Sequence, residues 1–266
     1  MEIDEKTIIC GSISAKPSRL GALIHNAGYK ALNLNYIYIP FPCHSAEGAV
    51  KGMRALGLRG IGVATPFKQQ IMPFLDKIDN VAVKIGSVNT IVNNNGLLTG
   101  YNTDYIGALE ALREATDPHN KVVILVGAGA TARSIAYGLK NAGATVHIYN
   151  RTFNKAVNIK NDFDLESAHK LEELKVAKNF DILINAATYS QDGNNHIPLE
   201  ILSKNQLIMD IIATETPLVK AATKAGCNLI KGYRMLLRQA KHQFEIYTGK
   251  KAPFKEMEDA LYKTLR

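Results

Sequence analysis

Cysteine is scarce in this 266-residue sequence, which contains Cys10, Cys43 and Cys227. The three are widely separated, and no pair has the two-residue spacing of a redox or zinc motif. A disulfide framework and a zinc site are therefore not expected, and a reducing compartment suits the chain. The seven histidines show no metal-ligand spacing either, so we predict no metal site.

Long apolar runs are also missing. The longest uncharged apolar stretch, near residues 122–130, falls well short of the ~20 residues that a membrane helix needs. The first six residues, Met-Glu-Ile-Asp-Glu-Lys, are too polar and acidic for a signal peptide. We therefore expect a cytoplasmic protein that does not associate with a membrane.

The net charge is +8, yet no run of like charges exceeds a pair or so. Tyrosine and phenylalanine are scattered and form no stacking stripe for nucleic acid. We therefore predict a small anionic partner rather than nucleic acid. Hydrophobic residues make up 46% and charged residues 21%, as in globular proteins, and the length allows one large domain or two modest ones.

Short β-like runs alternate with helical stretches along the whole chain, which predicts an α/β fold. In the first part we expect strands at 7–10, 35–39, 60–64 and 97–101, and helices near 21–28 and 46–55. Another helix is expected to begin at Pro66 with Thr65 as its N-cap, and a further one to span 104–115.

A regular strand–helix alternation follows residue 121. The expected strands are 122–126, 145–149, 182–186, 207–212 and 228–230, and one intervening helix begins at Thr216-Pro217. Crossovers of this length predict a Rossmann-type doubly wound parallel sheet. Two final helices, 233–247 and 253–265, are not needed for that sheet, so we expect them to return to a discontinuous first α/β domain.

A glycine-rich turn follows the first strand of this second part. Residues 122–126 run directly into Gly127-Ala128-Gly129, and a helical pattern opens at Ala130. Gly127 permits the tight turn, Gly129 lets the backbone approach a pyrophosphate, and Ala132 allows close packing of helix on strand. This context predicts dinucleotide binding, although a purely structural tight turn is the alternative.

The next strand ends in Asn150-Arg151-Thr152, with Lys155 close behind. NAD sites usually place a carboxylate here, which bonds the ribose 2′-hydroxyl and would repel a 2′-phosphate. Arg151 can instead bind a 2′-phosphate with two parallel bonds, and Asn150 and Thr152 can add neutral ones. The pattern favours NADP over NAD; a helix cap with solvated basic residues is the alternative.

Two further segments each end a β-like run and open a helix, Gly62-Val-Ala-Thr-Pro-Phe-Lys68 and Gly100-Tyr-Asn-Thr-Asp104. Lys68 lies in a first helical turn, where the dipole disfavours a cation and eases proton release, whereas Asp104 is favoured there as an anion. If the two meet, an ionised carboxylate would orient a lysine that exchanges a proton. The alternative is two ordinary helix-start charges.

These segments resemble the shikimate/quinate dehydrogenase family over nearly the whole chain. The resemblance also rests on Ile85-Gly-Ser-Val-Asn-Thr90, on Asn185-Ala186, and on Gly232-Tyr-Arg-Met-Leu236 followed by Gln239. The sequence departs from the family pattern at two places: Ala64 stands where threonine is usual, and no tyrosine follows residues 207–212. In these departures it resembles the shikimate dehydrogenase-like subgroup more than the main biosynthetic enzyme.

The resemblance implies the remaining roles. Lys68 and Asp104 would be the catalytic dyad, and Asn89, Asn102 and Gln239 would hold the hydroxyls and carboxylate of a cyclic acid. Either Ser18 or Ser14 would stand for the family's N-terminal serines, and Ala187 and Gly232 would join the cofactor site. Residues 1–103, with 232–266 returning to them, would bind substrate, and residues 104–231 would bind NADP.

The implied reaction is the reversible reduction of 3-dehydroshikimate by NADPH to shikimate, within aromatic amino acid biosynthesis. A quinate/shikimate dehydrogenase of catabolic role and a non-catalytic NADP- or ligand-binding regulator are the alternatives, and the presence of both Lys68 and Asp104 argues against the second. Lys16 and Arg19 add positive charge, so we expect one of them to bind the substrate carboxylate. We expect a monomer or a homodimer.

Overall fold

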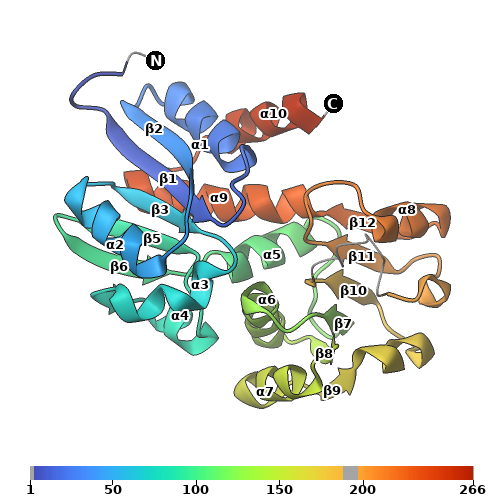
Figure 1. Cartoon of the computed structure of the whole chain (residues 1–266). Coiled ribbons are helices and arrows are strands. Elements are labelled where there is room, and N and C mark those ends of the chain that lie inside the picture. Colours follow the sequence, from blue (N-terminus) through green and yellow to red (C-terminus); the bar gives the residue numbers. More distant parts are fainter. Residues whose placement is uncertain (1–2, 188–196, 266) are drawn as a thin grey trace. The chain divides into compact units, whose positions relative to one another are not determined.

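The computed structural model describes residues 3–187 and 197–265 of the chain (Figure 1). Its α/β architecture, with two separate sheets, confirms the predicted fold class. The chain divides into two compact units, one formed by Met1–Thr103 with Gln239–Arg266 and the other by Asp104–Arg238. Among the described residues, no helix is long and apolar enough to cross a membrane.

The second unit is built on a six-stranded sheet in the order β9-β8-β7-β10-β11-β12. All neighbouring strands are parallel, and the order reverses between β7 and β10, which makes this pair the switch point of a doubly wound fold. The strands are β7 (Val122–Val126), β8 (Thr145–Asn150), β9 (Ser167–Lys170), β10 (Ile182–Asn185), β11 (Leu207–Asp210) and β12 (Asn228–Lys231).

Both faces of this sheet are covered, which explains its continuous apolar strands. Val123 and Leu125 of β7 pack toward α5 (Asp104–Leu112), α6 (Ala130–Asn141) and α7 (Phe153–Phe163). Ile124 and Val126 pack toward α8 (Pro217–Lys224) and the 3₁₀ turns η2 (Leu171–Val176) and η3 (Leu199–Ile201). Helix α8 begins at Thr216-Pro217 as predicted, and the Thr216 side chain caps it by accepting the Val219 N–H.

The first unit contains a mixed sheet in the order β2-β1-β3-β5-β6-β4. Strand β1 runs parallel to β2 and β3, whereas β5 is antiparallel to both β3 and β6. The strands are β1 (Ile8–Ser14), β2 (Tyr36–Pro42), β3 (Gly60–Val63), β4 (Lys77–Ile78), β5 (Thr90–Asn94) and β6 (Leu97–Tyr101). Strands β4 and β5 were not predicted from the sequence.

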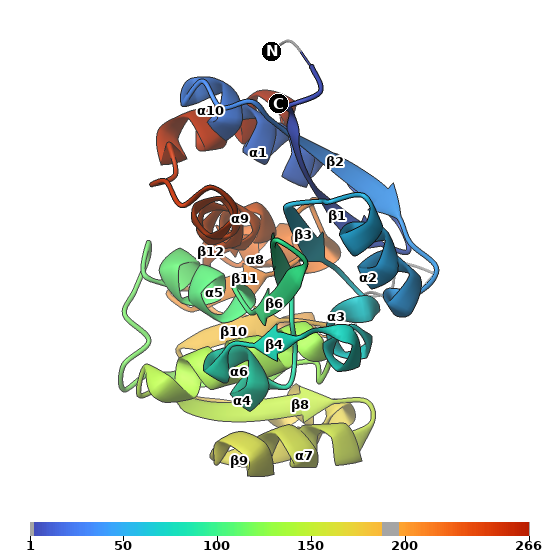
Figure 2. The same cartoon turned by 90° about the vertical axis from the view of Figure 1, so that its left-hand side faces the viewer.

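The helices of the first unit are α1 (Leu20–Ala31), α2 (Ala46–Ala55), α3 (Phe67–Gln70), the 3₁₀ turn η1 (Met72–Phe74), α4 (Asn80–Ile85) and α10 (Phe254–Leu265). Helix α9 (Gly232–Thr248) begins in the second unit and ends in the first. Helices α1 and α10 lie side by side (Figure 2). The predicted cap at Thr65 is wrong, because Pro66, which has no side-chain acceptor, occupies the N-cap of the one-turn α3.

A buried aromatic cluster joins α1, β2 and α9 within the first unit. The His25 ring stacks on Tyr38 with 4.3 Å between ring centroids and lies near Phe244 and Tyr247. His25 has no exposed surface, and neither ring nitrogen makes a hydrogen bond of good geometry within the described part of the chain. Burial lowers the pKa of His25 to about 3, and the nearby Gln243 side chain counteracts only part of this effect.

Candidate functional site

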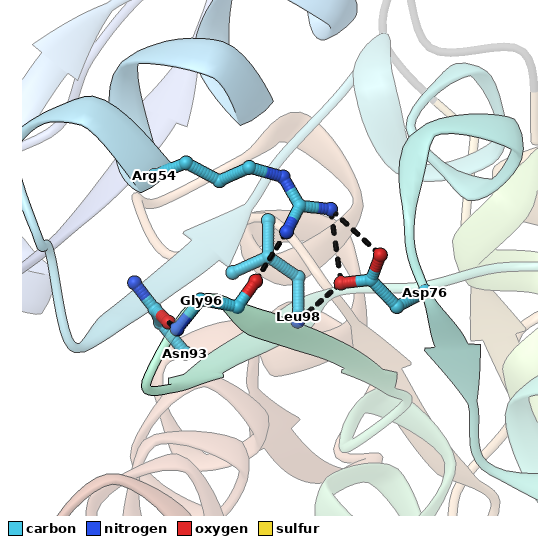
Figure 3. A network of polar contacts seen from close by, with 5 residues as sticks. All are labelled: Arg54, Asp76, Asn93, Gly96 and Leu98. Atoms are coloured by element: carbon cyan, nitrogen blue, oxygen red, sulfur yellow. Dashed lines mark hydrogen bonds and ion pairs between the residues drawn. The ribbon is translucent and has the colours of Figure 1, made fainter.

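The turn of the β5–β6 hairpin is held by a polar network (Figure 3). Arg54 of α2 donates to both carboxylate oxygens of Asp76, each at 2.9 Å, and to the Gly96 carbonyl oxygen. The Asp76 carboxylate also accepts the Leu98 N–H at 2.6 Å, and Asn93 Oδ1 accepts the Gly96 N–H at 2.7 Å. The backbone bond from Leu98 and the Arg54 guanidinium lower the pKa of Asp76. The network fixes one end of a hairpin whose other end carries predicted site residues.

Asn89 lies immediately before β5, at the open end of this hairpin. Its Oδ1 accepts the Thr103 N–H at 2.7 Å, and its Nδ2 donates to Thr103 Oγ1 at 3.0 Å. The Gln243 side chain of α9 donates to the Asn89 carbonyl oxygen at 3.2 Å and to Thr90 Oγ1 at 3.0 Å. All four residues are buried, so the position of Asn89 is fixed by the hairpin and by α9 together.

Asn102 follows β6 and is also buried. Its Nδ2 donates to the Ser87 carbonyl oxygen at 2.9 Å. Because Thr90 pairs with Tyr101 across the hairpin, Asn89 and Asn102 lie at the same end of it. The structure therefore brings these two predicted substrate ligands together.

The two predicted catalytic residues are both unusually buried for charged side chains. Lys68 is 9% exposed, and its carbonyl oxygen accepts the Val88 N–H at 2.9 Å, next to Asn89. Asp104 is 1% exposed and is the first residue of α5, where the helix dipole favours an anion. Lys68 belongs to the first unit and Asp104 to the second, so their pairing remains a prediction.

The other predicted substrate residues lie just before α1 and on α9. Ser18 is exposed, and its Oγ accepts the Leu20 N–H at 3.3 Å at the start of α1; Lys16 and Arg19 beside it are also exposed. Gln239 is half-buried on α9. The sequence reasoning missed Gln243, although it lies four residues after Gln239 and therefore on the same face of the helix.

In the second unit, the two glycines of the predicted phosphate loop differ in their surroundings. Gly127 has φ +111°, and a Cβ there would come within 2.8–2.9 Å of the Ala186 and Ala187 backbone. A Cβ on Gly129 would meet no atom within 4 Å. The packing of the fold therefore admits only glycine at position 127, whereas the space that a side chain at position 129 would occupy is open.

Helix α6 begins at Ala130, directly after this turn. Its N-cap, Gly129, has no side chain that could compete for the N–H groups of the first turn, which is the arrangement that binds phosphate. Ala132 has no exposed surface and belongs to the apolar core of this unit, against which Ala128 also packs.

The predicted 2′-phosphate residues lie together where β8 ends and α7 begins. Asn150 Nδ2 donates to the Thr152 carbonyl oxygen at 2.8 Å and so fixes the turn. Arg151, Thr152 and Lys155 are exposed, and the turn contains no carboxylate. This surface suits a phosphate better than a ribose hydroxyl.

Ala187 and Gly232 lie in the other half of the same sheet. The Ala187 N–H donates to Asn185 Oδ1 at 3.1 Å, directly after β10. A Cβ on Gly232 would overlap the Ile211 backbone at 2.4–2.5 Å. Ala187 is thus held at the end of β10, and Gly232 is packed against the segment that follows β11. No group of three or more potential ligands that could hold a metal ion occurs among the residues described.

Three family models match successive parts of the chain. A shikimate dehydrogenase substrate binding domain matches residues 16–91, a shikimate/quinate 5-dehydrogenase domain matches residues 110–218, and a shikimate 5′-dehydrogenase C-terminal domain matches residues 232–262.

Individual proteins match over nearly their full length. The chain is 36% identical to shikimate dehydrogenase (NADP(+)) of Caldanaerobacter subterraneus, with 94% of each chain covered. It is also 36% identical to the shikimate dehydrogenase-like protein of Haemophilus influenzae, with 92% of each covered. A crystal structure of a shikimate dehydrogenase in complex with NADP+ is 32% identical with a TM-score of 0.89, and the match covers 100% of this chain and 98% of that one. The chain thus belongs to the shikimate dehydrogenase family.

Proposed function

We propose that this protein catalyses the reversible, NADP-dependent reduction of 3-dehydroshikimate to shikimate. The observation that carries the proposal is the burial of Lys68 next to the strand end that bears Asn89, in a chain of this family. A lysine held beside the Asn89 amide could exchange a proton with a carbonyl oxygen bound there. A polar ring bearing a ketone, hydroxyls and a carboxylate would offer the carbonyl to Lys68 and its other substituents to the neighbouring amides.

Residues of the second unit would hold the cofactor. The N–H groups at the start of α6 would bind the pyrophosphate, and Arg151 would bind the 2′-phosphate with support from Thr152 and Lys155. NADPH, when bound, supplies the hydride that reduces the ketone. The turn at the end of β8 has no carboxylate, which is the group that would favour a bare 2′-hydroxyl over the phosphate.

Residues of the first unit, with Asp104 of the second, would hold the substrate and move the proton. Lys68 Nζ would give a proton to the ketone oxygen during reduction and take it back during oxidation. Asp104 would orient the ammonium. Asn89, Asn102 and Gln239 would bind the ring substituents, since amides both donate and accept.

A two-by-two absorbance assay of reduced nicotinamide tests the proposal, crossing shikimate and quinate with NADP+ and NAD+. We expect the highest kcat/KM for shikimate with NADP+. A preference for quinate with NAD+ would instead identify the catabolic alternative, and no turnover with cofactor still bound would identify the non-catalytic one. Cytoplasmic location and a monomeric or homodimeric state are further parts of the proposal and rest on the sequence.

The role of Lys68 is tested by Lys68→Ala. We expect turnover to fall by about 10²–10⁴-fold, the range for loss of a general acid–base group, while NADP+ binding stays near that of the unmodified protein. Lys84→Ala, which changes an exposed lysine of α4, is the matched control and should retain full turnover. Comparable kcat values for both variants would reject Lys68 as the proton donor.

A further inference from the structure

A buried carboxylate ends β11 in the half of the Rossmann sheet that follows the switch point. Asp210 is 1% exposed and accepts at least three hydrogen bonds. They come from Thr216 Oγ1 at 2.8 Å, from the Ile212 N–H at 3.1 Å and from Asn185 Nδ2 at 3.2 Å. Donors on β10, on the segment after β11 and at the start of α8 therefore converge on one side chain.

The effect of this carboxylate extends to the segment after β10. Asn185 uses its Nδ2 on Asp210, which leaves Oδ1 directed to the Ala187 N–H at 3.1 Å. The orientation of the Asn185 amide is therefore set by Asp210, because an amide turned the other way would place Oδ1 against a carboxylate oxygen. Asp210 thus fixes the backbone at Ala187 indirectly and at Ile212 directly.

These two segments are packed with almost no spare room. The Ala186 and Ala187 backbone lies within 2.9 Å of where a Gly127 Cβ would stand, and Ile211 within 2.5 Å of where a Gly232 Cβ would stand. This close packing prevents either segment from moving toward the phosphate loop or toward the start of α9, so a displaced segment would move away from both.

In a doubly wound fold, each half of the sheet binds one mononucleotide at the carboxyl ends of its strands. The Arg151 turn follows β8 in the first half, so the nicotinamide half of NADP would lie over the ends of β10 and β11. We propose that Asp210 is a positioning residue for the nicotinamide mononucleotide half of the cofactor, acting through the Ala187 and Ile212 backbone. This inference rests on the proposed function.

The test compares binding of NADP+ with binding of adenosine 2′,5′-bisphosphate, which lacks the nicotinamide half, by titration calorimetry. Asp210→Asn replaces one carboxylate oxygen by an NH2 group. Because both oxygens accept hydrogen bonds, this NH2 group must face one of the present donors and that bond is lost. We expect NADP+ to bind at least about tenfold more weakly, which corresponds to the loss of one bond to a buried charged group, with the bisphosphate unchanged. The kcat for shikimate should also fall about tenfold, while the KM for shikimate stays unchanged.

A milder pair guards against misfolding. Thr216→Val removes one bond to Asp210 together with the cap of α8 and should weaken NADP+ selectively, whereas Thr216→Ser keeps both and should bind NADP+ as the unmodified protein does. Asp181→Asn is the matched control, since its carboxylate also accepts a backbone N–H, that of Val122 at 2.8 Å, but at the amino-terminal ends of the strands of the same sheet. It should change neither affinity.

The outcomes distinguish failure of the positioning role from failure of the proposed function. Equal weakening of NADP+ and the bisphosphate, or no weakening of either, in Asp210→Asn overturns the positioning role and leaves the proposed function intact. Selective weakening of NADP+ in a protein that does not oxidise shikimate supports the positioning role and rejects the proposed reaction. An unmodified protein that binds neither compound overturns both.

Discussion

Acidification should destabilise this protein through His25. The ring is completely buried against Tyr38, and burial lowers its pKa from an ordinary 6.5 to about 3. Below pH 6.5 the unfolded chain binds a proton at His25, whereas the folded chain does not bind it until the pH approaches 3. The contribution of neutral His25 to stability is therefore present above pH 6.5 and is lost as the pH falls toward 3. Each pH unit in this window costs ~1.4 kcal/mol.

Between about pH 7 and about pH 5 the expected loss from His25 is therefore about 2 kcal/mol. Urea unfolding followed by far-UV circular dichroism measures it, since the sequence has no tryptophan for fluorescence. His25→Phe keeps an aromatic ring beside Tyr38 and should remove this part of the pH dependence. His44→Phe, which changes an exposed histidine, should retain it. The reasoning is refuted if His25→Phe loses as much stability on acidification as the unmodified protein.

Three further perturbations test the proposed site and its support. Arg151→Ala should weaken NADPH about tenfold to a hundredfold, the range for losing bonds to a charged group, and leave NADH unchanged in fluorescence titrations; equal effects would remove Arg151 from the 2′-phosphate site. Lys16→Gln or Arg19→Gln should raise the KM for shikimate with little change in kcat, and unaltered steady-state kinetics in both variants would reject a carboxylate-binding role. Asp76→Asn should lower the thermal midpoint of unfolding at neutral pH. Because folding lowers the pKa of Asp76 from its ordinary value of 3.8, the difference in midpoint from the unmodified protein should vanish only as the pH falls below 3.8. A difference that persists in acid would show that the charge of Asp76 is not the cause.

The elements that sequence reasoning located are those with a local apolar pattern. The predicted helix 46–55 coincides with α2, and the predicted strands 97–101 and 122–126 coincide with β6 and β7. Strand β9 was missed because Ser-Ala-His-Lys has no apolar alternation; its pairing with β8 includes a bond between His147 Nδ1 and Ser167 Oγ. Strand β5 had a usable signal, since Asn95-Gly96 is a two-residue turn with positive φ at both positions.

In the candidate site, too, the residues that the sequence identified lie in local patterns, and those that it missed depend on contacts between distant parts of the chain. The cofactor residues follow one another along a strand, a turn and a helix start, so their arrangement is local and visible in the sequence. Gln243 and Asp210 act through hydrogen bonds to residues distant in the chain, such as Asn89 and Asn185, and no spacing rule predicts those contacts. Ser18 was assigned from a family pattern, and its observed contact is a local hydrogen bond that its Oγ accepts from the Leu20 N–H.

The different surroundings of Gly127 and Gly129 bear on how this family can diversify. A library randomised at both positions, screened first for expression and then for turnover, should return only glycine at 127 in both screens, because any Cβ there meets backbone. At 129 the expression screen should admit alanine and other small residues, and only the turnover screen should exclude them. Position 129 is thus open to evolutionary drift in any descendant that gives up the dinucleotide, whereas position 127 stays under selection for as long as the fold itself is retained.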